Sequence, residues 1–248
     1  LKPLGYSTAC FGKWNIGFGP GSSPTERGFD AYLGNASGNC DYYTHVYAGR
    51  NDFFRGTEPV PDMKGYSTFL LADAACDFVR RNAKRPFFLY VPFNAVHYPG
   101  ARNKAPGVEC IWQAPDEAFR EYGWSPDTRD VEKRYYATVT ALDMGIGRVL
   151  DQLDRLSLAD NTLVIFFSDN GPNPWSSDDY PGNRGSEFMA GFENSLENIG
   201  HPNSNVAYEI GWGSASSGPL DLFKLTVGEG GIRSPMVVAG PAIQGGRQ

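Results

Sequence analysis

Short, uninterrupted runs of apolar residues predict three β-strands, and a later run is a fourth candidate. Uninterrupted hydrophobicity is typical of strands that are buried on both faces, as in a parallel sheet. Pro86 and Pro92 bound the second run, and the turn signal Asp160-Asn161 precedes the third. The runs are Thr8–Phe11, Phe87–Val91, Thr162–Phe167 and Met236–Ala239.

Two segments between these runs have the period of amphipathic helices. Apolar side chains recur every three or four residues from Tyr136 to Leu153, which predicts a long helix over Asp130–Leu156. A similar stripe predicts a helix over Thr68–Ala83. A strand, a long helix and a further strand in this order are typical of a βαβ crossover. The pattern therefore predicts an α/β fold in which helices sandwich a mostly parallel sheet.

Composition narrows the classes of function. The 248 residues are 41% hydrophobic and contain no apolar run long enough to span a membrane, so we expect one large domain or two small ones and no membrane segment. The net charge is −6 without any block of like charges, which argues against a nucleic-acid partner. An acidic protein can still bind an anionic substrate, but only through a few well-placed cations.

Polar residues follow directly after each of the first three predicted strands. Ligands of open α/β sheets bind beyond the carboxyl ends of the strands. If the sheet is parallel, these polar residues meet at one edge, together with a lysine that precedes a glycine-rich segment. They are Lys13 and Asn15 after the first strand, His97 after the second, Asp169 and Asn170 after the third, and Lys224 before Gly228–Gly231.

Each of these residues also has an ordinary structural interpretation. Asp169-Asn170-Gly171 is a favoured turn sequence, although it also offers two adjacent oxygen ligands for a hard cation such as calcium. A single histidine in a loop, such as His97, is often a surface residue, and lysines are ordinarily solvated. Lys13 and Asn15 are two residues apart, so in an extended chain they point to one face. Taken one at a time, none of these signals is specific.

Taken together, the segments resemble the motifs of type I sulfatases and follow the same order. Bacterial arylsulfatases in particular have a segment similar to the one that begins at Asn194 and continues to Trp212. The family motifs are matched by Gly5–Trp14 (GYxTxxxGKWHLG), Pro86–Pro99 (PFFLYxxxxxxHxP), Asp160–Gly171 (DNTxVIFxSDNG) and Glu229–Pro235 (EGGIRxP), and Asp41-Tyr42-Tyr43 resembles a further loop of the family.

The resemblance implies an alkaline-phosphatase-like fold that hydrolyses sulfate monoesters. In this family a Cys or Ser of a C/S-x-P-x-R motif becomes formylglycine, whose hydrate attacks the sulfur. Carried over by position, Lys13 and Lys224 bind sulfate oxygens, and His97 is a sulfate ligand or a proton donor to the leaving oxygen. Asp169 and Asn170 are two ligands of one Ca²⁺. The implied partner is a sulfated small molecule or carbohydrate.

The family's paired N-terminal aspartates and its C/S-x-P-x-R motif are not found in this chain. The near miss that begins at Ser22 has Glu26 where the motif requires Arg. Because the chain opens inside a family motif, we expect a partial sulfatase catalytic domain over residues 1–248 that lacks the first strand, the nucleophile and the C-terminal part. Formylglycine and the remaining calcium ligands then come from outside this chain, and the chain on its own is expected to be inactive.

Asn15 is a second departure, because the family usually has His at this position. That His is thought to hydrogen-bond the formylglycine, whereas Asn takes up no proton near neutral pH. The alternatives are an altered elimination step or a non-catalytic, calcium-binding pseudoenzyme module. A phosphate or phosphonate ester hydrolase of the same superfamily is a further alternative. The natural ester, the compartment and the oligomeric state are not readable from the sequence.

Overall fold

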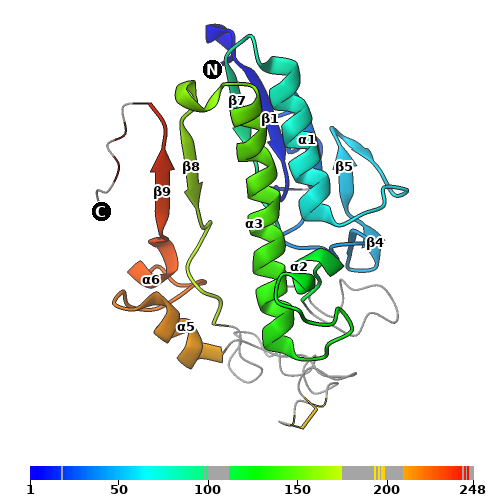
Figure 1. The fold of residues 1–248 in the computed structure, drawn as a ribbon, viewed down its shortest axis with the longest axis vertical. Helices are drawn as coiled ribbons and strands as arrows, with labels where there is room; N and C mark the ends of the chain where they lie inside the picture. The colour runs from blue at the N-terminus through cyan, green and yellow to red at the C-terminus, as the bar shows by residue number, and fades with distance from the viewer. Residues whose placement is uncertain are drawn as a thin grey trace. The chain divides into compact units, whose positions relative to one another are not determined.

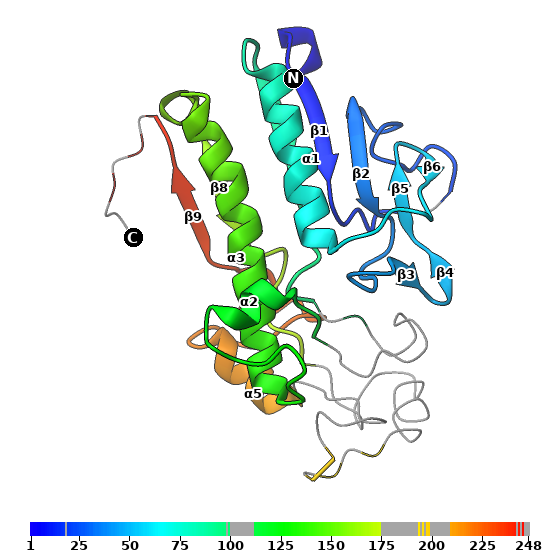
Figure 2. The ribbon, with the colours of Figure 1, turned by 45° about the vertical axis from the view of Figure 1, so that its right-hand side comes forward.

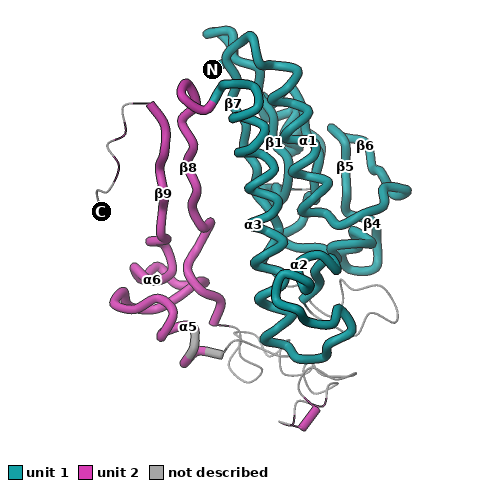
Figure 3. The backbone as a smooth tube through the Cα atoms, in the orientation of Figure 1, with its two compact units in different colours: residues 1–158 teal, residues 159–248 magenta. Residues whose placement is uncertain are grey.

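The computed structural model describes residues 1–17, 19–97, 99, 112–174, 193, 195, 197–198, 209–241, 243 and 245. The chain divides into two compact units, residues 1–158 and residues 159–248 (Figure 3). The first unit contains a five-stranded sheet, and the second contains a two-stranded sheet. None of the described helices is both long enough and apolar enough to cross a membrane.

The five-stranded sheet of the first unit is built around β1 (Ser7–Phe11). This strand pairs in parallel with β2 (Ala31–Asn35) on one side and with β7 (Phe87–Tyr90) on the other. Two antiparallel strands, β5 (Phe53–Arg55) and β6 (Glu58–Pro59), extend the sheet beyond β2 (Figure 2). The sheet is therefore mixed, and its parallel part lies on either side of β1.

Helices cover this sheet as the sequence pattern predicts. The helix α1 (Ser67–Asn82) packs on the sheet, and α3 (Val131–Arg155) lies beside α1 (Figure 1). Asp130 caps α3, because its side chain accepts the N–H groups of residues 132 and 133 and so satisfies donors that have no partner within the helix. The remaining elements of this unit are a 3-10 helix η1 (Lys2–Leu4), the strand pair β3 (Val46–Tyr47) and β4 (Arg50–Asn51), and α2 (Asp116–Arg120).

The main apolar core lies between the sheet and α1. All five residues of β1 are buried, as expected for a central strand with uninterrupted hydrophobicity. A second buried cluster lies around α2 and α3 and contains Tyr42, Tyr66 and Phe119. The core between the sheet and α1 is formed by Ala9, Phe11, Leu33, Phe53, Leu71, Ala75 and Phe78.

The second unit corrects one expectation from the sequence. Its strands β8 (Val164–Phe167) and β9 (Met236–Ala239) form the predicted elements, but they pair with each other in antiparallel orientation. Burial on both faces is wrong for them, because Phe166 and Phe167 are each 50% exposed and Met236 is 62% exposed. An apolar run becomes buried only where other elements cover it. The helices α5 (Glu209–Ser217) and α6 (Glu229–Ile232) pack against each other, and η3 (Ala159–Asn161) precedes β8.

The carboxyl ends of the parallel strands lie in direct backbone contact in the first unit. Gly12 follows β1 with a φ of +143°, and a Cβ atom built there would lie 2.0 Å from the carbonyl oxygen of Pro92. Real Cβ atoms do not approach backbone this closely. A residue other than glycine at position 12 would therefore force the two strand ends apart. The close approach of Gly12 to Pro92 therefore fixes the position at which the chain leaves β1.

We predict that Gly12→Ala lowers the free energy of unfolding by about 3 kcal/mol or more, because the clash is with backbone that has little room to move. Gly5→Ala is the matched control. Gly5 has a φ of +80° with nothing within 4 Å of a built Cβ. Gly5→Ala therefore measures the cost of a left-handed backbone alone, a loss of about 1–2 kcal/mol in the free energy of unfolding. Urea unfolding of both variants measures the difference. Equal losses in the two variants would show that the contact at Pro92 is not restrictive.

Candidate active site

The chain that follows β1 is held on both sides by hydrogen bonds to its neighbours. The N–H of Lys13 donates to the carbonyl of Pro92, which follows β7, at 2.8 Å. The N–H of Trp14 donates to the carbonyl of Asn35, the last residue of β2, at 2.9 Å. Because the bonds alternate between the two neighbouring strands, the backbone of Lys13 has a fixed position at the carboxyl edge. Its side chain is half-buried.

Asn15 lies at the end of this segment, and its backbone departs from the extended form. Its N–H donates to the carbonyl of Ala36 at 3.0 Å, and its φ is +53°. The expectation of an extended chain through Asn15 is therefore wrong. Asn and His are both enriched among residues with left-handed backbone, so the local conformation accommodates either. The side chain of Asn15 lies against Gly38, and the residue is exposed.

His97 is placed by the chain that follows β7. Its N–H donates to the carbonyl of Asn94 at 2.9 Å, and its own carbonyl accepts the hydroxyl of Tyr42 at 2.9 Å. Because β1 and β7 are parallel neighbours, Lys13 and His97 follow the carboxyl ends of adjacent strands. That the side chains of Lys13 and His97 meet stays a prediction.

Two other candidate segments come together in the second unit. Asp169 and Asn170 follow β8, as predicted, and the next residue, Gly171, donates its N–H to the carbonyl of Gly231 at 3.0 Å. The N–H of Lys224 donates to the carbonyl of Pro172, also at 3.0 Å. The turn after β8 and the Lys224 segment are therefore directly joined through the backbone. That these two segments share a site with Lys13 and His97 stays a prediction.

Asp169 and Asn170 have the donor chemistry that calcium prefers. Asp169 is exposed and supplies carboxylate oxygens. The amide nitrogen of Asn170 donates to the carbonyl of Gly171 at 2.9 Å. The amide oxygen of Asn170 therefore points away from that carbonyl. Calcium takes six to eight oxygen ligands, so this pair fits the ion but fills only part of its shell. Among the described residues, no group of three or more His, Cys, Asp or Glu side chains is gathered as a metal site.

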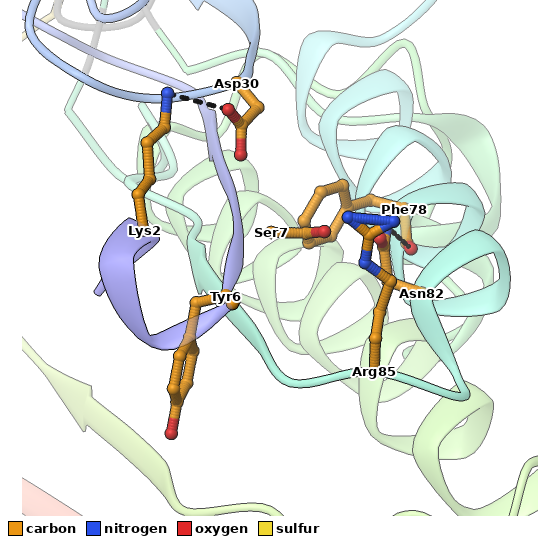
Figure 4. A pocket seen from close by; sticks show the side chains of 8 residues that line it. Lys2, Tyr6, Ser7, Asp30, Phe78, Asn82 and Arg85 are labelled. Atoms are coloured by element: carbon orange, nitrogen blue, oxygen red, sulfur yellow. Dashed lines mark hydrogen bonds and ion pairs between the residues drawn. The ribbon is translucent and has the colours of Figure 1, made fainter.

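A cavity of about 430 Å³ lies elsewhere in the first unit. It is lined by Ser7, the first residue of β1, and by the ion pair between Lys2 and Asp30 at 2.7 Å (Figure 4). Asn82, the last residue of α1, and Arg85 also line it. This cavity is at the amino end of β1, whereas Lys13 follows the carboxyl end, so it is separate from the candidate site.

Sequence reasoning missed the buried polar residues around Tyr42. Gln113 is 5% exposed, and its side-chain nitrogen donates to Asp41 at 2.7 Å. Its side-chain oxygen accepts the N–H of Tyr42 at 2.8 Å. The motif Asp41-Tyr42-Tyr43 was the one signal that pointed to this loop, and it gave no indication of Gln113.

Comparison with known proteins identifies the family of this chain. The family model "Sulfatase" matches residues 1–247. An uncharacterized sulfatase of Schizosaccharomyces pombe is 29% identical over 98% of this chain and 52% of its own length. The arylsulfatase of Klebsiella aerogenes is 28% identical over 98% of this chain and 61% of its own length. The crystal structure of Ps i-CgsB matches with a TM-score of 0.64 at 26% identity, over 97% of this chain and 46% of that one.

The α/β fold and these matches place the chain in the alkaline phosphatase superfamily. Within it, this chain belongs to the sulfatase family, and its resemblance to type I sulfatases is confirmed. The chain spans about half the length of the first curated relatives that it matches, 52% and 61% of their residues.

The loop that contains Tyr42 also contains a buried histidine, His45. His45 is fully buried and stacks on Phe53 with ring centroids 4.4 Å apart. Burial lowers the pKa of His45 from 6.5, and Lys64 acts in the same direction, whereas Asp41 and the backbone of Gly65 oppose the shift. The folded chain therefore holds this ring neutral.

We predict that stability falls as the pH drops below about 6.5, because the unfolded chain then binds a proton that the folded chain does not take up until a lower pH. His45→Asn removes this titration and tolerates the left-handed φ of 57°. Urea unfolding of both proteins at about pH 7 and about pH 5 tests this. The variant is expected to lose less stability on acidification than the wild type, and equal losses would contradict the assignment to His45.

Proposed function

We propose that the intact protein hydrolyses a sulfate monoester. The observation that carries the proposal is the hydrogen bonding of the segment after β1, in which Lys13 donates to Pro92 on one side and Trp14 donates to Asn35 on the other. These bonds fix a lysine at the sheet edge where α/β hydrolases bind ligands. The proposed site comprises Lys13, Asn15, His97, Asp169, Asn170 and Lys224.

The proposed roles follow from the charge of the substrate. A sulfate monoester carries negative charge on its oxygens, and more charge develops on the leaving oxygen as the ester bond breaks. Fixed cations stabilise such charge best when they are oriented before the reaction begins. Lys13 and Lys224 are proposed to bind the sulfate oxygens. His97 is proposed to bind sulfate or to supply a proton to the leaving oxygen.

Calcium is part of the proposal. Asp169 and Asn170 are proposed as two of the ligands of one Ca²⁺, which supplies positive charge near the sulfate oxygens when it is bound. The nucleophile is proposed to be a formylglycine made from a Cys or Ser outside this chain. The protein groups described above then hold the sulfate and its leaving oxygen in place.

A sulfated carbohydrate is the proposed class of substrate. One relative is the human N-acetylgalactosamine-6-sulfatase, 30% identical over 79% of this chain and 36% of its own length. Ps i-CgsB, at 27% identity and a TM-score of 0.62, has been solved in complex with k-i-k-neocarrahexaose. These names support a sugar sulfate ahead of a simple aryl sulfate, which remains suitable as an assay substrate.

A non-catalytic module is the second candidate, and Asn15 is the residue that favours it. An amide in place of imidazole can hydrogen-bond a neighbouring group but cannot take its proton. If turnover requires that proton transfer, the protein binds sulfate esters without hydrolysing them. The two candidates differ in whether the full-length protein releases free sulfate.

We predict that Lys13→Gln in the full-length protein lowers kcat/KM for an aryl sulfate by about 10²–10³, as the loss of one oriented charge-stabilising group does in other hydrolases. Lys2→Gln is the matched control, because Lys2 makes only a half-exposed ion pair with Asp30, and its activity should be unchanged. Release of sulfate is measured beside release of phosphate from the corresponding aryl phosphate. A higher rate with the phosphate ester would favour the phosphohydrolase alternative.

We also predict that Asn15→His in the full-length protein raises turnover, because an imidazole can accept the proton that an amide cannot. The left-handed backbone at this position suits both residues, so the variant should fold as stably as the wild type. The measurement is kcat under saturating substrate. An unchanged or lower kcat in a folded variant would mean that Asn15 belongs to a different arrangement of the site.

A further inference from the structure

We propose that Tyr42 is a positioning residue for His97, and this inference rests on the proposed function of His97. The hydroxyl of Tyr42 donates to the backbone carbonyl of His97 at 2.9 Å across 55 positions of sequence. The N–H of His97 makes a local bond, to the carbonyl of Asn94. The bond from Tyr42 therefore connects the backbone of His97 to a loop that is distant in the sequence.

The ring of Tyr42 has little freedom to move. Its side chain is fully buried and stacks on Tyr66 with ring centroids 5.3 Å apart and planes at 20°. The surrounding cluster includes Phe119 and Ala137 from α2 and α3. Burial raises the pKa of Tyr42 well above its ordinary value, so the hydroxyl stays a neutral donor. A rigid ring with a fixed donor holds the carbonyl that it contacts.

The backbone of Tyr42 is fixed as firmly as its ring. Its N–H donates to the side-chain oxygen of Gln113 at 2.8 Å, while the side-chain nitrogen of Gln113 donates to Asp41 at 2.7 Å. The carbonyl of Gln113 in turn accepts the hydroxyl of Thr138 on α3 at 3.3 Å. Tyr42 is thus connected through Gln113 to the longest helix of the unit, and movement of the ring would break several buried hydrogen bonds at once.

A second contact joins the same two segments. The amide nitrogen of Asn94 donates to the carbonyl of Cys40 at 3.2 Å, and Asn94 is 3% exposed. The turn from Asn94 to His97 is therefore attached to residues 40–42 at both of its ends. With the backbone held in this way, the imidazole of His97 can reorient only by rotation of its own side chain.

The chain offers a close control for Tyr42. Tyr66 is in the same ring stack, is 4% exposed, and also donates its hydroxyl to a backbone carbonyl, that of Gln113, at 3.0 Å. Tyr42→Phe and Tyr66→Phe therefore remove the same atom from the same cluster. They differ in whether the lost partner is His97.

The test uses the full-length protein with ¹³C-labelled histidine, and His97→Asn identifies the His97 signal. Tyr42→Phe is expected to shift and broaden this signal, and Tyr66→Phe is expected to leave it in place. In the sulfatase assay, Tyr42→Phe should lower kcat by about tenfold with KM within about twofold, because small displacements of a reacting group reduce rate more than binding. Tyr66→Phe should keep kcat near the wild-type value.

The outcomes separate this inference from the proposed function. An unchanged His97 signal in a folded Tyr42→Phe variant overturns the positioning role, and so do equal shifts in the two Phe variants. If the wild type releases no sulfate, the proposed function fails, yet the histidine signal still decides the role of Tyr42. If Tyr42→Phe does not fold, Asn94→Ala replaces it, since loss of the bond to Cys40 should move the same signal.

Discussion

The backbone from Gly12 to Asn15 is held by hydrogen bonds to the chain on both sides of it, and the position of Lys13 depends on these bonds. A strand that leaves a parallel sheet normally loses its neighbours, yet here residues 12–15 donate in turn to Leu33, Pro92, Asn35 and Ala36 at 2.8–3.0 Å. The close approach at Gly12 makes this alternation possible. Lys13 and His97 then follow the ends of adjacent parallel strands.

Much of the first unit could be predicted because its signals are local. Uninterrupted hydrophobicity identified β1 and β7, and the helical period placed α1 and α3 to within one residue of the observed ends. The same reasoning failed for the surroundings of β8 and β9. Hydrophobicity shows that a strand prefers burial, but the described elements of the second unit leave Phe166 half exposed. Pairing partners depend on the whole chain, and periodicity carries no information on them.

The site shows the same division between local and distant information. The backbone placement of Lys13 and His97 followed from the rule that ligands bind at the carboxyl ends of parallel strands. Tyr42 and Gln113 could not be found in this way, because their contacts join residues 55 and 71 positions apart. Buried polar residues of this kind pair with one another, because each buried hydrogen-bond donor requires an acceptor. Their number in a sequence reveals nothing about which donor meets which acceptor.

We propose that the two lysines bind one sulfate group. Membership of the sulfatase family makes the claim reasonable, and Asn15 marks where this chain departs from the family pattern. The most direct measurement is a crystal structure of the full-length protein with bound sulfate. We predict that Lys13 and Lys224 both contact the ion within hydrogen-bond distance, with His97 beside it. Sulfate bound without either lysine, or lysines on separate surfaces, would contradict the account.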